Sequence, residues 1–142
     1  MTETKSTVDS RMAMYTRIEM KAHSSVALAA AVAAVKQLET DFNTATLTFS
    51  KLDLVATYKT KFPGVNNWGL QFYREADILF MEADSSTSNL QRIWQLVTHE
   101  VSHQWFGDVA TFPWWDEIWL SEGIATYFEY FTPLEVQALC EC

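Results

Sequence analysis

Cysteine is scarce in this chain, and both cysteines, Cys140 and Cys142, lie at its C-terminal end. With one residue between them, they are too close in sequence to form an easy disulfide with each other. No other cysteine is present to complete a disulfide framework, and two thiolates do not make a zinc site. We therefore expect a tail with two free thiols, a reading that leaves the redox compartment open.

Basic residues are also few, because ten lysines and arginines stand against 18 acidic residues, for a net charge of −8. Such a balance disfavours contact with phosphate backbones, so no nucleic-acid partner is expected. Excess negative charge mostly serves solubility, although it also favours cationic groups such as the free amine of a peptide.

No hydrophobic run is long enough to cross a membrane. The longest, Val26–Val35, falls well short of the roughly 20 residues that a spanning helix needs. It follows a polar stretch, Met1–Ser10, which does not resemble a signal peptide. We expect a soluble segment without membrane contact, and the parent protein fits either a cytoplasmic or a membrane-anchored extracellular location.

The composition supports one folded domain. The chain has 142 residues, of which 49% are hydrophobic and 14% aromatic, and this is enough to bury a core. Many aromatic residues crowd between Trp94 and Phe131, which is typical of a packed core and less often of a binding cleft.

Residue patterns predict helices and strands in an order typical of an α+β domain. Alternation and turn residues predict a loop at Pro63–Gly64 and strands at Tyr15–Ile18, Thr46–Tyr58, Trp68–Arg74 and Ile78–Met81. Three helices are predicted. A serine cap begins the first, from Ser24 or Ser25 to about Phe42, and a capping box at Ser88 and Gln91 begins the second, from about Asn89 to Gly107, whose glycine ends it. The third runs from about Ile118 to Tyr130 and ends before Pro133.

The second of these helices contains the sequence His99-Glu100-Val101-Ser102-His103. Histidines at positions i and i+4 lie one turn apart on the same helical face, so both rings can reach a single ion. Glu100 lies on the flank of that face, where it can approach the water of the metal without being a ligand. The bare motif also occurs by chance as an exposed histidine pair, so it requires supporting context.

Glu122 is the candidate for the third ligand that a catalytic zinc site needs. Eighteen residues separate it from His103, which allows a turn at Gly107, a loop past Pro113 and a return on the next helix. Nitrogen and carboxylate ligands suit zinc, whereas magnesium and calcium prefer shells of oxygen. We predict one zinc ion per chain.

The stretch from His99 to Tyr130, HEVSHQWFGDVATFPWWDEIWLSEGIATYFEY, closely resembles the gluzincin aminopeptidases. This family includes aminopeptidase N, the puromycin-sensitive enzyme and leukotriene hydrolase. Its pattern is HExxH, 18 residues and a glutamate, embedded in HQWFG and a WLxEGxAxYxEY-like segment. The run Lys51–Ala56 resembles the strand before the substrate loop of the family, and the resemblance covers roughly residues 15–131.

The resemblance implies a thermolysin-like zincin catalytic domain, in which a small mixed sheet packs on the HExxH helix and the third-ligand helix. It implies zinc on His99, His103 and Glu122, with Glu100 as the general base that takes a proton from the zinc-bound water and returns it to the leaving amine. The expected activity is removal of N-terminal residues from peptide substrates.

The chain departs from the family at the loop that recognises the substrate's free amine. The family has a GAMEN sequence there, whose glutamate binds the amine, and the matching residues here are 63–67, Pro-Gly-Val-Asn-Asn. Asn66 stands at the position of that glutamate, and a neutral amide accepts a hydrogen bond without charge pairing. Asn67 and Gly69 are further candidates for contact with the substrate backbone, and Pro-Gly-Asn chemistry also suits an ordinary turn.

A transition-state tyrosine lies well downstream of the third ligand in the family, beyond the end of this chain. We interpret residues 1–142 as a partial catalytic domain without the family's N-terminal β-domain and C-terminal helical domain. An alternative function is therefore a catalytically impaired zinc-binding homologue or fragment that binds peptides without efficient turnover. A helical core fragment without zinc is the third interpretation, and the ligand spacing argues against it.

Ligating histidines usually have acceptors behind them that orient their rings. Glu129 lies seven residues after Glu122, on the same helical face, and is the candidate for this role. Asp108 and Asp116 are weaker candidates, and a solvated carboxylate is the alternative for all three.

Overall fold

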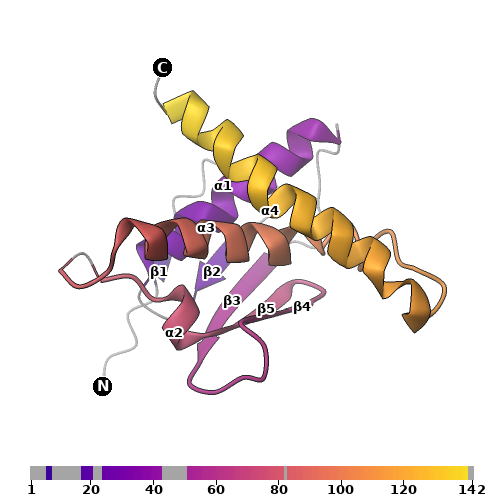
Figure 1. The fold of residues 1–142 in the computed structure, drawn as a ribbon, viewed down its shortest axis with the longest axis horizontal. Coiled ribbons are helices and arrows are strands. Elements are labelled where there is room, and N and C mark those ends of the chain that lie inside the picture. The colour runs from indigo at the N-terminus through magenta and orange to yellow at the C-terminus, as the bar shows by residue number, and fades with distance from the viewer. Residues whose placement is uncertain (1–5, 8–16, 21–23, 43–50, 82, 141–142) are drawn as a thin grey trace.

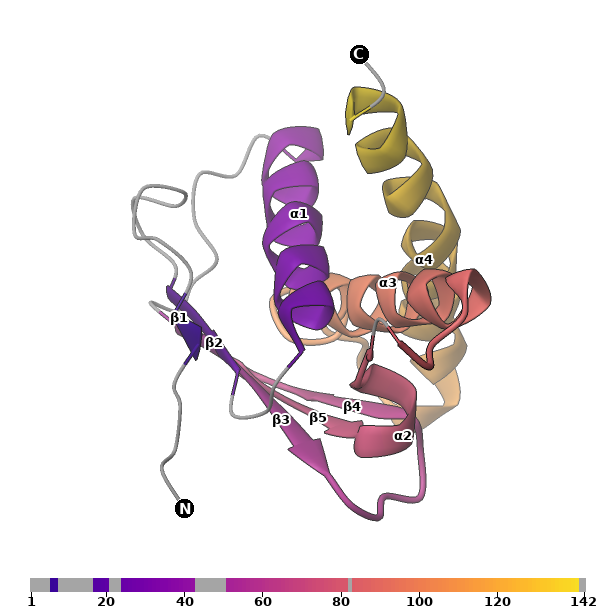
Figure 2. The same ribbon diagram turned by 90° about the vertical axis from the view of Figure 1, so that its left-hand side faces the viewer.

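The computed structural model describes residues 6–7, 17–20, 24–42, 51–81 and 83–140, with side chains within 24–134. One mixed sheet lies below a layer of helices (Figures 1 and 2). The strands are β1 (Ser6–Thr7), β2 (Arg17–Met20), β3 (Lys51–Thr57), β4 (Gly64–Asn67) and β5 (Leu70–Arg74). The helices are α1 (Ser25–Asp41), α2 (Glu75–Ile78), α3 (Thr87–Ser102) and α4 (Ile118–Cys140), with a 3₁₀ turn, η1 (Trp115–Glu117), before α4.

The sheet has the strand order β1-β2-β3-β5-β4, which makes β4 an edge strand. The pairs β2–β3 and β3–β5 are parallel, whereas β1–β2 and β4–β5 are antiparallel. Alternate residues of β3 are fully buried at Leu52 and Leu54, as expected for a strand with one face on a core. The predicted α+β class agrees with this arrangement.

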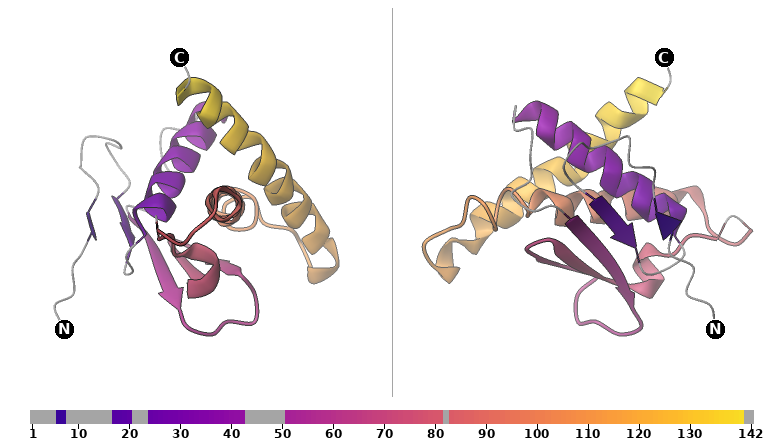
Figure 3. Two further views of the ribbon diagram at one scale, coloured as in Figure 1. Left: turned by 60° about the vertical axis from the view of Figure 1, so that its left-hand side comes forward. Right: turned by 180° about the vertical axis from the view of Figure 1, so that it is seen from behind.

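Helix α1 begins at the predicted cap, because the Ser24 hydroxyl accepts a hydrogen bond from the backbone N–H of Ala27 at 3.2 Å. Its inner face is lined by alanines at 27, 30, 31 and 34, none of them more than 1% exposed. Such small side chains let α1 pack closely on α3. As Figure 3 shows, α3 lies between α1, α4 and the sheet, so the HExxH helix is the central helix of the fold.

Several predicted bounds are wrong. The strand predicted at Ile78–Met81 is absent, and α2 occupies Glu75–Ile78 because Ile78 is buried within a helical turn that begins with acidic residues. The loop predicted at Pro63–Gly64 leads at once into β4, since Gly64 pairs with Tyr73 of β5. Of the strands predicted at Tyr15–Ile18 and Thr46–Tyr58, residues 15–16 and 46–50 lie outside the described residues.

The helix ends also differ from the prediction. Ser86, not Ser88, caps α3, because its hydroxyl accepts from the Asn89 N–H at 3.3 Å. The α3 helix ends at Ser102 rather than at Gly107, and the residues after Ser102 form a turn that leads to Gly107. Helix α4 runs through Pro133 to Cys140. Proline costs a helix one hydrogen bond, but its fixed φ is itself helical, so it does not force the helix to end there.

Candidate metal centre

His99 in the last turn of α3 and His103, the residue that caps this helix, lie one turn apart with their Nε2 atoms 3.2 Å from each other. Both side chains are largely covered, with 17% of His99 and 9% of His103 exposed. The packing of α1, α4 and the sheet around α3 therefore leaves only a small part of each ring exposed.

Glu122, in the second turn of α4, brings its carboxylate to the same point. Its Oε2 lies 3.3 Å from His99 Nε2 and its Oε1 lies 3.6 Å from His103 Nε2. All three ligand atoms lie within 4.8 Å of one another. The turn after α3 and the loop before η1 thus bring together the three residues that the sequence predicted as ligands.

The spacing and chemistry of these donors fit a zinc ion. Ligand bonds of 2.0–2.1 Å in tetrahedral geometry place neighbouring donor atoms about 3.3 Å apart. The observed separations of 3.2, 3.3 and 3.6 Å match that edge length. Two imidazole nitrogens and one carboxylate make a donor set that zinc accepts and that leaves a fourth position open. Half of the Glu122 side chain is exposed, so its carboxylate is accessible from solvent.

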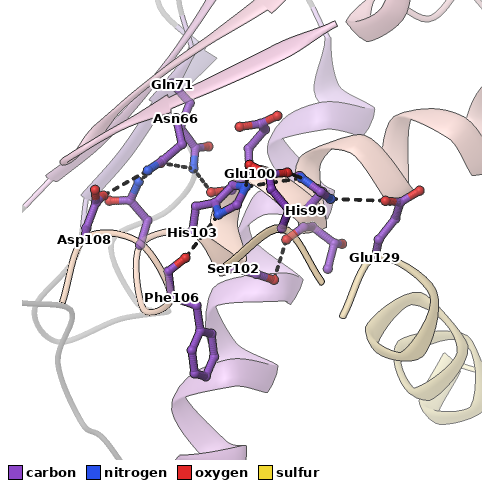
Figure 4. A network of polar contacts seen from close by, with 12 residues as sticks. Asn66, Gln71, His99, Glu100, Ser102, His103, Phe106, Asp108 and Glu129 are labelled. Atoms are coloured by element: carbon purple, nitrogen blue, oxygen red, sulfur yellow. Dashed lines mark hydrogen bonds and ion pairs between the residues drawn. The ribbon is translucent and has the colours of Figure 1, made fainter. Parts of the chain in front are cut away.

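Each histidine has an acceptor behind its ring, shown by dashed lines in Figure 4. His99 Nδ1 lies 3.1 Å from Glu129 Oε2, and His103 Nδ1 lies 3.1 Å from the carbonyl oxygen of Phe106. A proton held at Nδ1 leaves Nε2 as the free nitrogen. The sequence did not predict the contact with the Phe106 carbonyl, because every residue type has a backbone carbonyl and no particular side chain marks it.

Glu100 is only 5% exposed and lies against the backbone of Gly64 in β4. A Cβ atom at residue 64 would clash with Glu100 Oε1, and no hydrogen bond to this carboxylate is found among the described residues. Burial, together with the nearby charges of Glu122 and Glu129, raises the pKa of Glu100 to about 8 in the metal-free chain. Its oxygens have no hydrogen bond from the described residues, so in the ionised form they are free to accept a proton, as general-base chemistry requires.

Burial also lowers the pKa of His103, although the Phe106 carbonyl and the surrounding acids oppose that effect. The ring is therefore neutral at neutral pH, which is the form that binds a metal. Asp108 shows the opposite direction, because burial raises its pKa while hydrogen bonding from Asn66 and the charge of His103 lower it.

The three residues predicted to contact substrate lie on and after β4, next to the C-terminal end of α3. Asn66 Nδ2 donates to Asp108 Oδ2 at 3.0 Å, and its Oδ1 accepts from Gln104 Nε2. Gln104 is fully buried and also accepts from the Gly69 N–H at 3.0 Å and donates to the Asn67 carbonyl at 3.1 Å. These atoms of Asn67 and Gly69 are thus paired within the chain, while the side chain of Asn67 is exposed.

Gln104 and Gln71 are two residues of this site that sequence reasoning missed. Gln71 is fully buried on β5, donates to the Glu100 carbonyl at 2.7 Å and accepts from the Tyr73 hydroxyl at 2.7 Å. It therefore ties the sheet to helix α3 at Glu100, the residue that the sequence predicts as the general base. Its place in the alternation of β5, paired with Asn66 of β4, is the signal that could have found it. Asp116 lies exposed in η1, without a contact to either histidine among the described residues.

Comparison with known proteins decides the family, because residues 26–138 match the Peptidase family M1 domain. The chain belongs to peptidase family M1. This confirms the resemblance to gluzincin aminopeptidases. It is similar to the glutamyl aminopeptidase of Bos taurus, with 45% identity over 80 residues, which are 56% of this chain and 8% of that protein.

Two further relatives extend this similarity. An aminopeptidase A of Gloydius brevicauda is 45% identical over 80 residues, again 56% of this chain and 8% of that protein. An aminopeptidase N of Haemonchus contortus is 37% identical over 128 residues, which are 90% of this chain and 13% of that protein. The chain thus spans only a small part of these M1 relatives. In the described part of the chain, no helix is both long and apolar enough to cross a membrane.

Proposed function

We propose that this chain carries the zinc-binding and proton-transferring part of an M1 aminopeptidase of the thermolysin-like zincin type. His99, His103 and Glu122 would hold one zinc ion, and Glu129 would orient His99. The observation that carries the proposal is the convergence of the three donors at 3.2–3.6 Å, from two helices, at the edge length of a tetrahedral zinc site.

When bound, zinc supplies Lewis-acid chemistry that acidifies a water molecule and polarises the scissile carbonyl. The protein contributes the proton transfers. The Glu100 carboxylate, covered by Gly64 and free of hydrogen bonds from the described residues, accepts the proton of the attacking water and returns it to the leaving amine nitrogen. Gln71 and the packing of β4 hold α3 so that this carboxylate stays beside the ligand pair.

The substrates are peptides with a free N-terminus, in keeping with the aminopeptidase names of the relatives. A second candidate function is a zinc-binding homologue that holds peptides with little turnover. The observation in its favour is Asn66, whose neutral amide is occupied by hydrogen bonds within the chain.

The test is a comparison of zinc content and peptide hydrolysis in matched variants. We expect one zinc per wild-type chain by elemental analysis, and a loss of at least about 100-fold in zinc affinity for Glu122→Gln, since it removes a ligand rather than an outer partner. Glu117→Gln, a nearby acid that hydrogen-bonds to Trp119 instead, is the control and should bind zinc normally.

Glu100→Gln should keep the zinc ion and lose hydrolysis of aminoacyl fluorogenic substrates. Zinc-free protein after reconstitution would reject the metal site, and an active Glu100→Gln variant would reject the assignment of the base. Zinc binding by a wild-type chain that fails to hydrolyse any peptide would favour the second function.

A further inference from the structure

The acids around the metal centre do not all have a function assigned above. Glu122 faces both histidines, Glu129 contacts His99 Nδ1, and Glu100 is the proposed base. Asp108 is a fourth carboxylate in this region of the described structure, and it lies in the same polar network (Figure 4). An enzyme that acts at a free N-terminus requires a negative group for the ammonium, and the other three carboxylates are already engaged.

Backbone geometry holds Asp108 beside the second histidine. Gly107 has φ +145°, a backbone conformation that residues with a side chain rarely adopt, and this turn returns the chain toward the end of α3. The Asp108 N–H then donates to the His103 carbonyl at 3.0 Å. The position of this carboxylate is therefore set by the same turn that holds the His103 ring.

The side chain of Asp108 is held on one oxygen only. Its Oδ2 accepts from Asn66 Nδ2 at 3.0 Å, and Oδ1 has no hydrogen bond from any residue that the structure describes. The side chain is half-buried, so its charge is less screened than that of a fully exposed acid. As far as the described residues are concerned, one oxygen thus remains for a donor supplied by a ligand.

The side-chain oxygen of Asn66, by contrast, has no capacity left. An amide oxygen offers two lone pairs. Asn66 Oδ1 accepts from Gln104 Nε2 and, at 3.4 Å, from Gln71 Nε2. Its remaining group, Nδ2, is a donor and points at Asp108. The residue at the family's amine-binding position therefore cannot accept from an ammonium, and it orients an acid that can.

We propose that Asp108, oriented by Asn66, binds the protonated α-amine of the substrate. This inference rests on the proposed function, because it assumes a peptide placed at the metal centre. A hydrogen bond between an ammonium and a carboxylate is roughly twice as strong as one between neutral groups, so the charge carried by Asp108 distinguishes free from blocked N-termini.

The test measures binding rather than turnover. The zinc-loaded chain is titrated calorimetrically with L-leucine hydroxamate and with its N-acetyl derivative, both of which carry a zinc-chelating group. Wild type should bind the free amine at least about tenfold more tightly. Asp108→Asn, which keeps an oxygen for the Asn66 N–H and so preserves folding, should lose that preference and bind the acetylated ligand unchanged.

Asp116→Asn, an equal change of charge at an exposed acid, is the matched control and should keep the preference. Equal preference in wild type and Asp108→Asn, or no preference in wild type, would overturn the assignment of Asp108. If the acetylated hydroxamate still binds in that case, the zinc site and the proposed function stand. If neither ligand binds because zinc is absent, the proposed function itself fails.

Discussion

The two histidines of the metal centre are oriented by different kinds of partner. His103 relies on the backbone carbonyl of Phe106, within its own turn, whereas His99 relies on the Glu129 carboxylate of another helix. Every residue type supplies a backbone carbonyl, so the Phe106 contact does not depend on a particular side chain. A carboxylate, by contrast, places a negative charge beside the ring that it contacts. The orientation of the His99 ring therefore depends on a single side chain that substitution can remove.

Replacing Glu129 with glutamine should weaken zinc binding by about 10- to 100-fold, the usual effect of losing a partner behind a ligating histidine. The amide oxygen can still accept from Nδ1, but without the charge. Competition with a chromophoric chelator at neutral pH measures the affinity, and Glu117→Gln serves as the control. Equal zinc affinity in Glu129→Gln and wild type would show that the contact is incidental.

At the scale of elements, the site depends on the turn that follows α3. Gly107 in its left-handed conformation bends the chain so that the Phe106 carbonyl meets His103 Nδ1 and the Asp108 N–H meets the His103 carbonyl. A Cβ at Gly107 would meet the His103 carbonyl oxygen at 3.2 Å and His103 Nδ1 at 3.6 Å. Neither the backbone strain nor this crowding can be relieved without moving His103, one of the three proposed zinc ligands.

Gly107→Ala should destabilise the fold by about 1–3 kcal/mol and weaken zinc binding with it. Gly123→Ala is the matched control, because an added Cβ there meets nothing within 4 Å and the residue lies within helix α4. That control should stabilise the chain by roughly 0.5–1 kcal/mol, since alanine loses less entropy in a helix. Denaturant unfolding of both variants measures the difference, and equal stabilities would contradict the prediction.

For the whole molecule, the metal centre gathers negative charge in a chain whose net charge is already −8. Three carboxylates, Glu100, Glu122 and Glu129, act on one another closely enough that burial and mutual repulsion raise the pKa of Glu100 to about 8. A carboxyl whose pKa is higher in the folded than in the unfolded chain binds its proton more tightly when folded. Without metal, the folded state is therefore favoured by protonation of Glu100.

The stability of the zinc-free chain should fall as pH rises from about 4.5 to about 8, relative to a Glu100→Gln variant. The effect is on the order of 1.4 kcal/mol for each pH unit between the two pKa values, fully present below the lower one and lost above the upper one. Urea unfolding at pH 5 and pH 8 with a chelator measures it. A difference between wild type and Glu100→Gln that does not change with pH would contradict the prediction.

Sequence reasoning was most reliable where a local pattern has a local cause. The alanine-rich helix and its Ser24 cap, and the presence of a helix around His99, follow from propensity and periodicity. It failed at α2 and at Pro133, where a short apolar run and a proline each permit two structures. Only packing decides between them: Ile78 is buried in a helical turn, and α4 continues through its proline.

The sequence by itself determined the residue types of the proposed zinc site, the one-turn spacing of His99 and His103, and the family to which the chain belongs. These follow from helical periodicity and from motif letters, which do not depend on distant contacts. Only the tertiary structure decided that Glu122 reaches the two rings, that Gln104 and Gln71 tie the sheet to α3, and that Asn66 orients Asp108. Those contacts join residues of different elements, and packing of the helices on the sheet is what brings such residues together.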